Sequence, residues 1–293
     1  MTTLGAVFLP QFPPERLRAF ARAADEAGLE ELWLWEDCFK ESGVASAAAA
    51  LAWTGRLRVG VGLLPVPLRN VALTAMEIAT LERLFPGRLV VGVGHGVQDW
   101  MGQVGARVGS PLTLLREYLV ALRRLLDGEQ VTTEGTHVRL DKVALDWPPS
   151  PPPALLAGAI GPRTLRLCGE LADGTILPSE TSPDDLRKAR ALVDEGLAAA
   201  GRDREDRPHP LTVYLLAATG PGAERRVLAE LRTDPSDDPA EVSVAGDARA
   251  VAEAVRRCAD AGADTVVLQP TADDPDPEGF MRFVAREVRP LVP

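Results

Sequence analysis

Residues 258–268 read CADAGADTVVL, in which the end of a helix, a glycine and a short apolar strand follow one another. The same order recurs in CGELADGTIL at residues 168–177 and in AADEAGLEELWLW at residues 23–35. A repeated helix–strand unit predicts parallel strands that are joined by helical crossovers. The chain is therefore expected to belong to the α/β class.

Eight short runs rich in Val, Leu and Trp are candidate strands. They show little alternation, which is typical of strands that are buried on both faces. Eight strands in 293 residues, with no compositional break or linker, favour a closed (β/α)8 TIM barrel over a doubly wound open sheet. We expect one domain over residues 1–293. The runs lie at residues 5–9, 31–35, 57–63, 89–94, 154–157, 175–177, 212–217 and 265–268.

Segments of helical period lie between these strands. The fourth helix is expected at residues 112–126, where leucines recur at steps of three and four. Two other apolar stripes end just before Gly28 and Gly262, where a helix C-terminus favours a left-handed residue. Residues 128–153 interrupt the alternation, and they predict a short hairpin insertion between the fourth helix and the fifth strand.

Composition excludes several functional classes. The chain is 46% hydrophobic and 25% charged, as in a soluble globular protein, and its net charge of −10 argues against nucleic-acid or anionic-membrane partners. No apolar run is long enough for a membrane span. Three distant cysteines and three histidines lack the spacing of a disulfide framework or a metal site. We expect a cytoplasmic protein without a metal, whose partner is a small molecule.

Polar residues that directly follow the strands are the candidates for chemistry, because a barrel gathers its active site there. Glu36 and Asp37 follow the second strand and could act as acid or base, or else could be a solvated residue and a helix cap. His95 follows the fourth strand and could be a donor or acid in the pocket, or a structural histidine. Gln98, Asp99 and Trp100 are expected on the substrate side.

Glycines surround two of these strand ends. The sequence GVGHG at residues 92–96 resembles half of a dinucleotide fingerprint, but no amphipathic helix opens after it. Its small residues could instead let a planar ring approach the backbone. After the fifth strand, GAIGPR at residues 158–163 precedes a helix, so that backbone N–H groups and Arg163 could bind a phosphate.

Four longer blocks resemble the luciferase-like monooxygenase superfamily, and within it the oxidoreductases that use the deazaflavin coenzyme F420. The resemblance covers nearly the whole chain and rests on the order and spacing of the blocks. They are VGVGLLPVPLRNVALTAMEIATLERLFPGRLVVGVGHG at 59–96, PLTLLREYLVALRRLLDGEQVTTEGTHVRL at 111–140, PPPALLAGAIGPRTLRLCGELADGTIL at 151–177 and VAGDARAVAEAVRRCADAGADTVVLQP at 244–270.

The resemblance implies a TIM barrel with the deazaflavin ring at the C-terminal ends of the strands. It also implies a non-prolyl cis peptide at the end of the third strand, which here is Gly62–Leu63. Asp37 would lie near the ring, and the acid and base candidates are Asp37, His95 and Glu36. The residues expected to contact the cofactor are Asp37, Gly62, Leu63, Gly94, Gly96, Gly158, Ala159, Ile160, Gly161 and Arg163.

Two departures from the family pattern bear on the substrate. Cys38 stands where deazaflavin-dependent sugar-phosphate dehydrogenases have a histidine, and Val97 stands where they have a catalytic glutamate. We therefore expect an F420-dependent oxidoreductase of unknown substrate. The alternatives are a monooxygenase that uses FMN and dioxygen, and a cofactor-binding barrel without catalysis. Family members often form dimers, so a homodimer is expected.

Overall fold

A computed structural model describes residues 2–204, 208–231 and 238–292. Eight parallel strands of the described chain form the barrel, and each run was predicted to within two residues at either end. The predicted TIM barrel is thereby confirmed. The strands are β1 (Thr3–Phe8), β2 (Glu31–Leu34), β3 (Arg58–Pro65), β4 (Leu89–Gly94), β7 (Leu155–Gly158), β8 (Gly174–Leu177), β9 (Leu211–Ala218) and β11 (Thr265–Gln269).

Pairing between neighbouring strands runs around the whole barrel. The order is β1-β2-β3-β4-β7-β8-β9-β11, β11 returns to β1, and β8 pairs with β9 from Thr175↔Leu211 onward. This closure excludes the doubly wound open sheet. The register between β3 and β4 shifts between Val61 and Leu64, so β3 is irregular near its C-terminal end.

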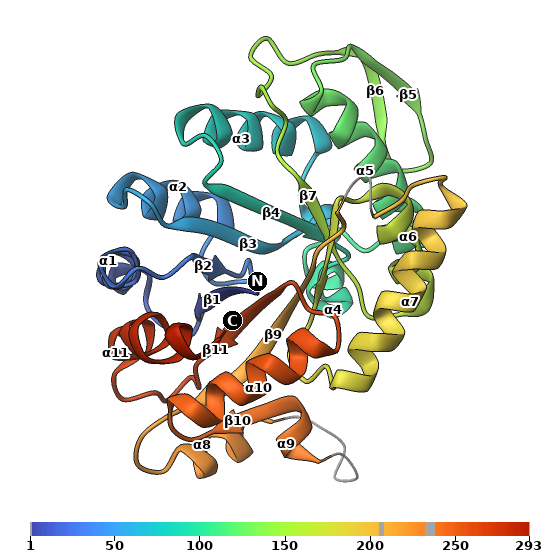
Figure 1. The fold of residues 1–293 in the computed structure, drawn as a ribbon. Coiled ribbons are helices and arrows are strands. Elements are labelled where there is room, and N and C mark those ends of the chain that lie inside the picture. The colour runs from blue at the N-terminus through green and yellow to red at the C-terminus, as the bar shows by residue number, and fades with distance from the viewer. Residues whose placement is uncertain (1, 205–207, 232–237, 293) are drawn as a thin grey trace.

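Helices surround the strands on the outside (Figure 1). Gly28 has φ of 90° and Gly262 has φ of 111°, which confirms the left-handed residues predicted after the first and last stripes. The surrounding helices are α1 (Leu17–Ala27), α2 (Gly43–Trp53), α3 (Val71–Leu84), α5 (Pro111–Leu126), α6 (Pro162–Leu171), α7 (Pro183–Ala199), α10 (Ala248–Asp260) and α11 (Pro277–Phe283).

The predicted hairpin is confirmed between α5 and β7. Its antiparallel strands are β5 (Val131–Glu134) and β6 (Arg139–Val143), which lie at the periphery of the barrel (Figure 1). The carboxylate of Glu117 on α5 accepts hydrogen bonds from the N–H groups of Thr136, His137 and Val138, and so ties the turn to the helix.

Several short elements decorate this barrel. They are α4 (Gln98–Gln103), α8 (Ala223–Glu230), α9 (Pro239–Val242) and β10 (Ser243–Ala245), 3₁₀ turns at Pro14–Arg16, Val66–Leu68 and Arg289–Leu291, and a π-helical turn at Val284–Val288. Of these, α4 directly follows β4, at the C-terminal end of a barrel strand.

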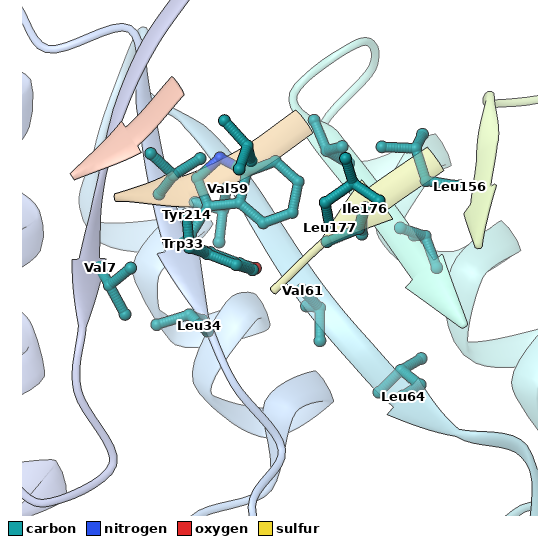
Figure 2. Packing of buried hydrophobic residues seen from close by; sticks show 14 of the residues in the cluster. Val7, Trp33, Leu34, Val59, Val61, Leu64, Leu156, Ile176, Leu177 and Tyr214 are labelled. Atoms are coloured by element: carbon teal, nitrogen blue, oxygen red, sulfur yellow. The ribbon is translucent and has the colours of Figure 1, made fainter. Parts of the chain in front are cut away.

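Trp33 fills the interior of the barrel. Its side chain is fully buried, and its indole N–H donates to Glu31 at 2.8 Å. A Cβ added at Gly5 or Gly60 would press on the indole, so these two glycines, on the strands β1 and β3 that flank β2, make room for it. Figure 2 shows Trp33 and Tyr214 together among the aliphatic side chains of the interior. These rings support the floor of the cavity described next.

Candidate functional site

A cavity of about 490 Å³ opens at the C-terminal ends of the barrel strands. Cavities that hold small molecules and cofactors usually measure about 300–1,000 Å³. Its wall comes from the residues that end or follow β2, β3, β4, β7 and β8, with side chains of β8 and β9. The lining residues are Trp35, Glu36, Asp37, Gly62, Leu63, Pro65, His95, Gly96, Val97, Trp100, Gly158, Ala159, Ile160, Gly161, Thr164, Ile176, Pro178, Ser179 and Tyr214.

Gly62, Leu63 and Tyr214 form one side of this cavity. The peptide bond Gly62–Leu63 is cis, as the resemblance implied. The hydroxyl of Tyr214 in β9 donates a hydrogen bond of 3.1 Å to the carbonyl oxygen of Gly62. Burial raises the pKa of Tyr214, so the phenol stays protonated and remains a donor at neutral pH.

The position of Tyr214 is set by two tryptophans. Its ring meets Trp33 and Trp35 edge to face, with centroids 5.9 and 5.3 Å away. A Cβ on Gly62 would collide with the Tyr214 hydroxyl and the Trp33 ring. Position 62 must therefore be glycine for the two strands to approach this closely.

Gly94 and Gly158 leave room for the side chain of Leu63. A Cβ on either glycine would overlap the Leu63 methyl groups. Gly158 still reaches the cavity wall, whereas Gly94 is buried and lies outside it. The glycine expected under a ligand at position 94 is thus explained by packing inside the protein.

Glu36 is held in an ion-pair network. Its Oε2 accepts from Arg69 at 2.7 Å and from the N–H of Gly43 at 2.8 Å, and its Oε1 accepts from Arg69 at 3.0 Å. Arg69 also binds Glu77 at 2.8 Å. Both oxygens of Glu36 have partners that stabilise the charged form, which suits positioning better than proton transfer.

Asp37 follows Glu36 on the cavity wall and is partly exposed. Its carbonyl oxygen accepts from the N–H of Lys40 at 2.8 Å, which turns the loop back towards α2. Burial, reinforced by the charges of Glu36 and Asp37, raises the pKa of the Cys38 thiol. Cys38 therefore stays protonated, which argues against a nucleophilic role.

His95 and Thr164, which both line the cavity, lie within hydrogen-bond distance of each other. The Nε2 of His95 lies 3.1 Å from the Thr164 hydroxyl oxygen, and its buried Nδ1 has no hydrogen-bond partner among the described residues. Burial lowers the pKa of His95, and the nearby backbone of Pro111 only partly opposes this effect. The imidazole is therefore neutral at pH 7, and with Thr164 it presents a polar, uncharged group.

The N-terminus of α6 borders the mouth of the cavity. Gly161 caps the helix with φ of −80°, and Ile160, Gly161 and Arg163 are exposed. A Cβ on Gly161 would meet open space. Neither internal packing nor backbone conformation requires glycine here, and the position is open to the approach of a ligand.

Most of the residues predicted for catalysis and cofactor binding line the cavity. The exceptions in this set are Gly94, which is buried behind Leu63, and Arg163, which is exposed in the first turn of α6. Trp100 also lines the cavity. Gln98 and Asp99 do not: Gln98 binds the carbonyl of His95, and Asp99 pairs with Arg107 at the surface.

Sequence reasoning missed three important lining residues, Trp35, Thr164 and Tyr214. Trp35 directly precedes Glu36 and was assigned to the strand itself. Thr164 directly follows Arg163, so the strand-end rule could have included both. Tyr214 lies inside a buried strand, and no local pattern distinguishes it from a core residue.

Two kinds of site find no support in the described residues. No group of three or more His, Cys, Asp or Glu side chains is placed to hold a metal ion. No helix in the described part is both long and apolar enough to cross a membrane.

The sequence matches a family whose description is luciferase-like monooxygenase, over residues 2–232. The 5,10-methylenetetrahydromethanopterin reductase of Methanolobus tindarius is 30% identical over 205 residues, which are 70% of this chain and 62% of the relative. The F420-dependent glucose-6-phosphate dehydrogenase of Nakamurella multipartita is 32% identical over 211 residues, 66% of this chain and 60% of the relative. The chain thus spans about three fifths of the length of these curated relatives.

A solved structure is similar over nearly the whole chain. The coenzyme F420 dependent tetrahydromethanopterin reductase from Methanopyrus kandleri superposes with a TM-score of 0.86 and covers 99% of both chains. The sequence identity is 21%, so this likeness concerns the fold alone.

Proposed function

Because the chain belongs to the luciferase-like monooxygenase family, we propose that it is an oxidoreductase that binds coenzyme F420 and transfers a hydride between the deazaflavin and an organic substrate. The observation that carries the proposal is the cavity at the barrel mouth, one side of which is the Gly62–Leu63 backbone held by Tyr214. The F420-dependent relative from Nakamurella multipartita supports the choice of cofactor. In this proposal the whole chain acts as one domain.

The cavity fits a flat aromatic ring. Gly62 has no side chain, and Leu63 packs partly into the space left by Gly94 and Gly158, so much of this wall is main chain. Trp35 adds an aromatic side chain to the same cavity. When bound, the deazaflavin supplies the hydride chemistry, and the protein orients the ring and excludes water.

The phosphate and the acidic tail of the cofactor are proposed to lie at the N-terminus of α6. Helix N-termini favour anions because their first N–H groups point outward without helical partners. Gly161 leaves open space there, and the exposed Arg163 adds a positive charge near the mouth. Among the described residues no lysine or arginine lines the cavity, and His95 is neutral at pH 7, so the negative groups are best placed outside it.

His95 and Asp37 are the proposed groups for proton handling. His95 is neutral at pH 7, and its Nε2 with the Thr164 hydroxyl can hold a polar atom of the substrate in position. Asp37 lies on the wall and can accept a hydrogen bond from the ligand. Glu36 was predicted as a third acid or base, and we propose that it positions this loop through its pair with Arg69.

A second candidate function is an FMN-dependent monooxygenase that uses dioxygen. The description of the matched family as monooxygenase favours it. The same main-chain wall and helix N-terminus would accept the flavin ring and its phosphate. The two candidates differ in the cofactor that the protein binds.

Equilibrium titration of the purified protein with F420 and, separately, with FMN tests this proposal. Trp35 and Trp100 line the cavity, so a ring bound there should quench tryptophan fluorescence. We expect saturable quenching by F420 and none by FMN at the same concentrations. Saturable quenching by FMN alone would establish the monooxygenase candidate. If neither cofactor quenched the fluorescence, the cofactor assignment would be overturned. Binding of F420 without turnover on any substrate would support the inactive barrel.

We also propose that the protein works in the cytoplasm as a homodimer. The exposed residues Leu73, Met76 and Leu84 lie along one face of α3 and are 47%, 57% and 64% exposed. We propose that these three side chains form part of the surface that the second subunit covers. Met76→Lys should convert a dimer to a monomer in light-scattering measurements, and an unchanged mass would reject this interface.

A further inference from the structure

The charge pattern of the cavity wall constrains the substrate. Among the described residues, the wall carries two carboxylates, Glu36 and Asp37, and no lysine or arginine. Arg69 lies behind the wall, where it forms ion pairs with Glu36 and Glu77. An anionic substrate would therefore lose its hydration beside two acidic groups without gaining a cation.

The rim of the cavity is apolar on the side of α4 and α6. Val97 is 47% exposed and Ile160 is 81% exposed, and both belong to the lining together with the indole of Trp100. Val97 is the N-cap residue of α4 and does not pack into the core, so folding does not require an apolar side chain there. Exposed apolar side chains around a concave site indicate that an apolar ligand covers them.

We propose that the substrate is uncharged and has a largely hydrocarbon body, which packs against Val97, Trp100 and Ile160, while its polar reacting group faces His95 and Thr164. This inference rests on the proposed function, because it names the substrate class of the same cavity. It separates this chain from a sugar-phosphate dehydrogenase such as its Nakamurella multipartita relative. A phosphorylated substrate would bring its charge to a wall whose carboxylates are not balanced by any lysine or arginine of the lining.

Arg163 does not alter this conclusion. Its side chain is exposed in the first turn of α6 and is outside the lining of the cavity. In the proposed function, Arg163 provides a positive charge for the phosphate and the acidic tail of the cofactor. No lysine or arginine of the described chain therefore lines the substrate side of the cavity.

Calorimetric binding of probes that differ in charge tests the inference. Benzaldehyde and 4-formylbenzoate share a ring and a carbonyl group and differ by one carboxylate, and cyclohexanone and 2-octanone add uncharged probes of other shapes. We expect the protein loaded with F420 to bind at least one uncharged probe. It should also bind benzaldehyde about tenfold more tightly than 4-formylbenzoate, because the free energy needed to desolvate an unpaired carboxylate is at least as large as a tenfold difference in affinity. Val97→Lys should narrow this ratio to about threefold or less by adding a cation to the rim.

A matched control separates this effect from a general change of charge. Leu228→Lys places the same charge on the exposed face of α8, outside the cavity, and should keep the tenfold ratio. Tighter binding of 4-formylbenzoate, or the failure of every uncharged probe to bind, would overturn the inference. F420 binding is measured separately in the same samples, and the probes are also titrated into protein without F420. If the protein bound the uncharged probes but not F420, the cofactor assignment would be refuted, while the proposal of an uncharged, apolar substrate would still be supported.

Discussion

The hydroxyl of Tyr214 donates a hydrogen bond of 3.1 Å to the carbonyl oxygen of Gly62 across the interior of the barrel. The bond joins β9 to the irregular end of β3, two strands that are not neighbours in the sheet. It fixes the stretch of main chain that faces the cavity. The affinity for a flat cofactor should therefore depend on this one buried pair.

Tyr214→Phe should lower both stability and cofactor affinity. The Gly62 carbonyl would lose its donor, which costs about 1 kcal/mol in the free energy of unfolding. We expect weaker binding of F420 in fluorescence titration because the wall is less firmly held.

Tyr118→Phe is the matched control for this variant. Tyr118 is also buried and donates to the Thr74 hydroxyl at 2.7 Å, but it does not line the cavity. It should lose similar stability in urea denaturation and keep the wild-type F420 affinity. Equal loss of affinity in both variants would show that Tyr214 acts only through global stability.

Gly161→Ala should weaken the binding of the cofactor without affecting the fold. The added methyl meets open space and the φ of −80° suits alanine, so the free energy of unfolding should be unchanged or slightly higher. The methyl would nevertheless occupy the position from which a phosphate approaches the helix N-terminus. Gly109→Ala also meets open space, lies outside the cavity and should bind F420 normally. Equal F420 affinities for the two variants would place the phosphate elsewhere.

Arg69→Met should destabilise the protein strongly. Arg69 is 13% exposed and binds both Glu36 and Glu77, so its loss leaves a carboxylate of low exposure without a cation, at a cost of about 3 kcal/mol. The double variant Arg69→Met, Glu36→Gln should recover part of this loss, because the less exposed of the two partners of Arg69 is then neutral, although Glu77 keeps its charge.

The exposed pair of Arg107 and Asp99 provides the comparison for Arg69. Arg107→Met should cost less than about 1 kcal/mol in urea denaturation, since both side chains are well exposed. Similar costs for the two arginines would show that the network around Glu36 is not rigid.

His209 should make the protein less stable in mild acid. Burial, followed by the charges of Arg202 and Arg190, lowers the pKa of His209 to about 4 from the ordinary 6.5. Between pH 6.5 and 4 His209 is therefore protonated in the unfolded chain but not in the folded one. The free energy of unfolding falls as the pH drops through this range, by up to about 3 kcal/mol. His209→Gln, which can keep the hydrogen bond to Thr175, should flatten the pH dependence measured by urea denaturation. An equally steep dependence in the variant would assign the effect to other groups.

The barrel was predictable because each of its strands is marked in the sequence by a short run of apolar residues. Runs such as residues 89–94 are buried on every side, and Gly28 and Gly262 mark helix ends by a conformation that glycine adopts without strain. The short α4 was not predicted, since its six residues carry no clear apolar period.

The cavity was only partly predictable, because its walls depend on contacts between distant segments. Strand ends identified Asp37 and His95, which both line the cavity. Tyr214 meets Gly62 only after the barrel closes, and the packing of Leu63 against Gly94 joins two strands. Such contacts leave no periodic signal in the sequence.

A crystal structure of the protein grown with F420 tests the central claim most directly. We predict that the deazaflavin ring lies in the barrel mouth against the main chain of Gly62 and Leu63, with its phosphate at the N-terminus of α6. A ring bound outside this cavity, or a phosphate held far from Gly161, would contradict the account.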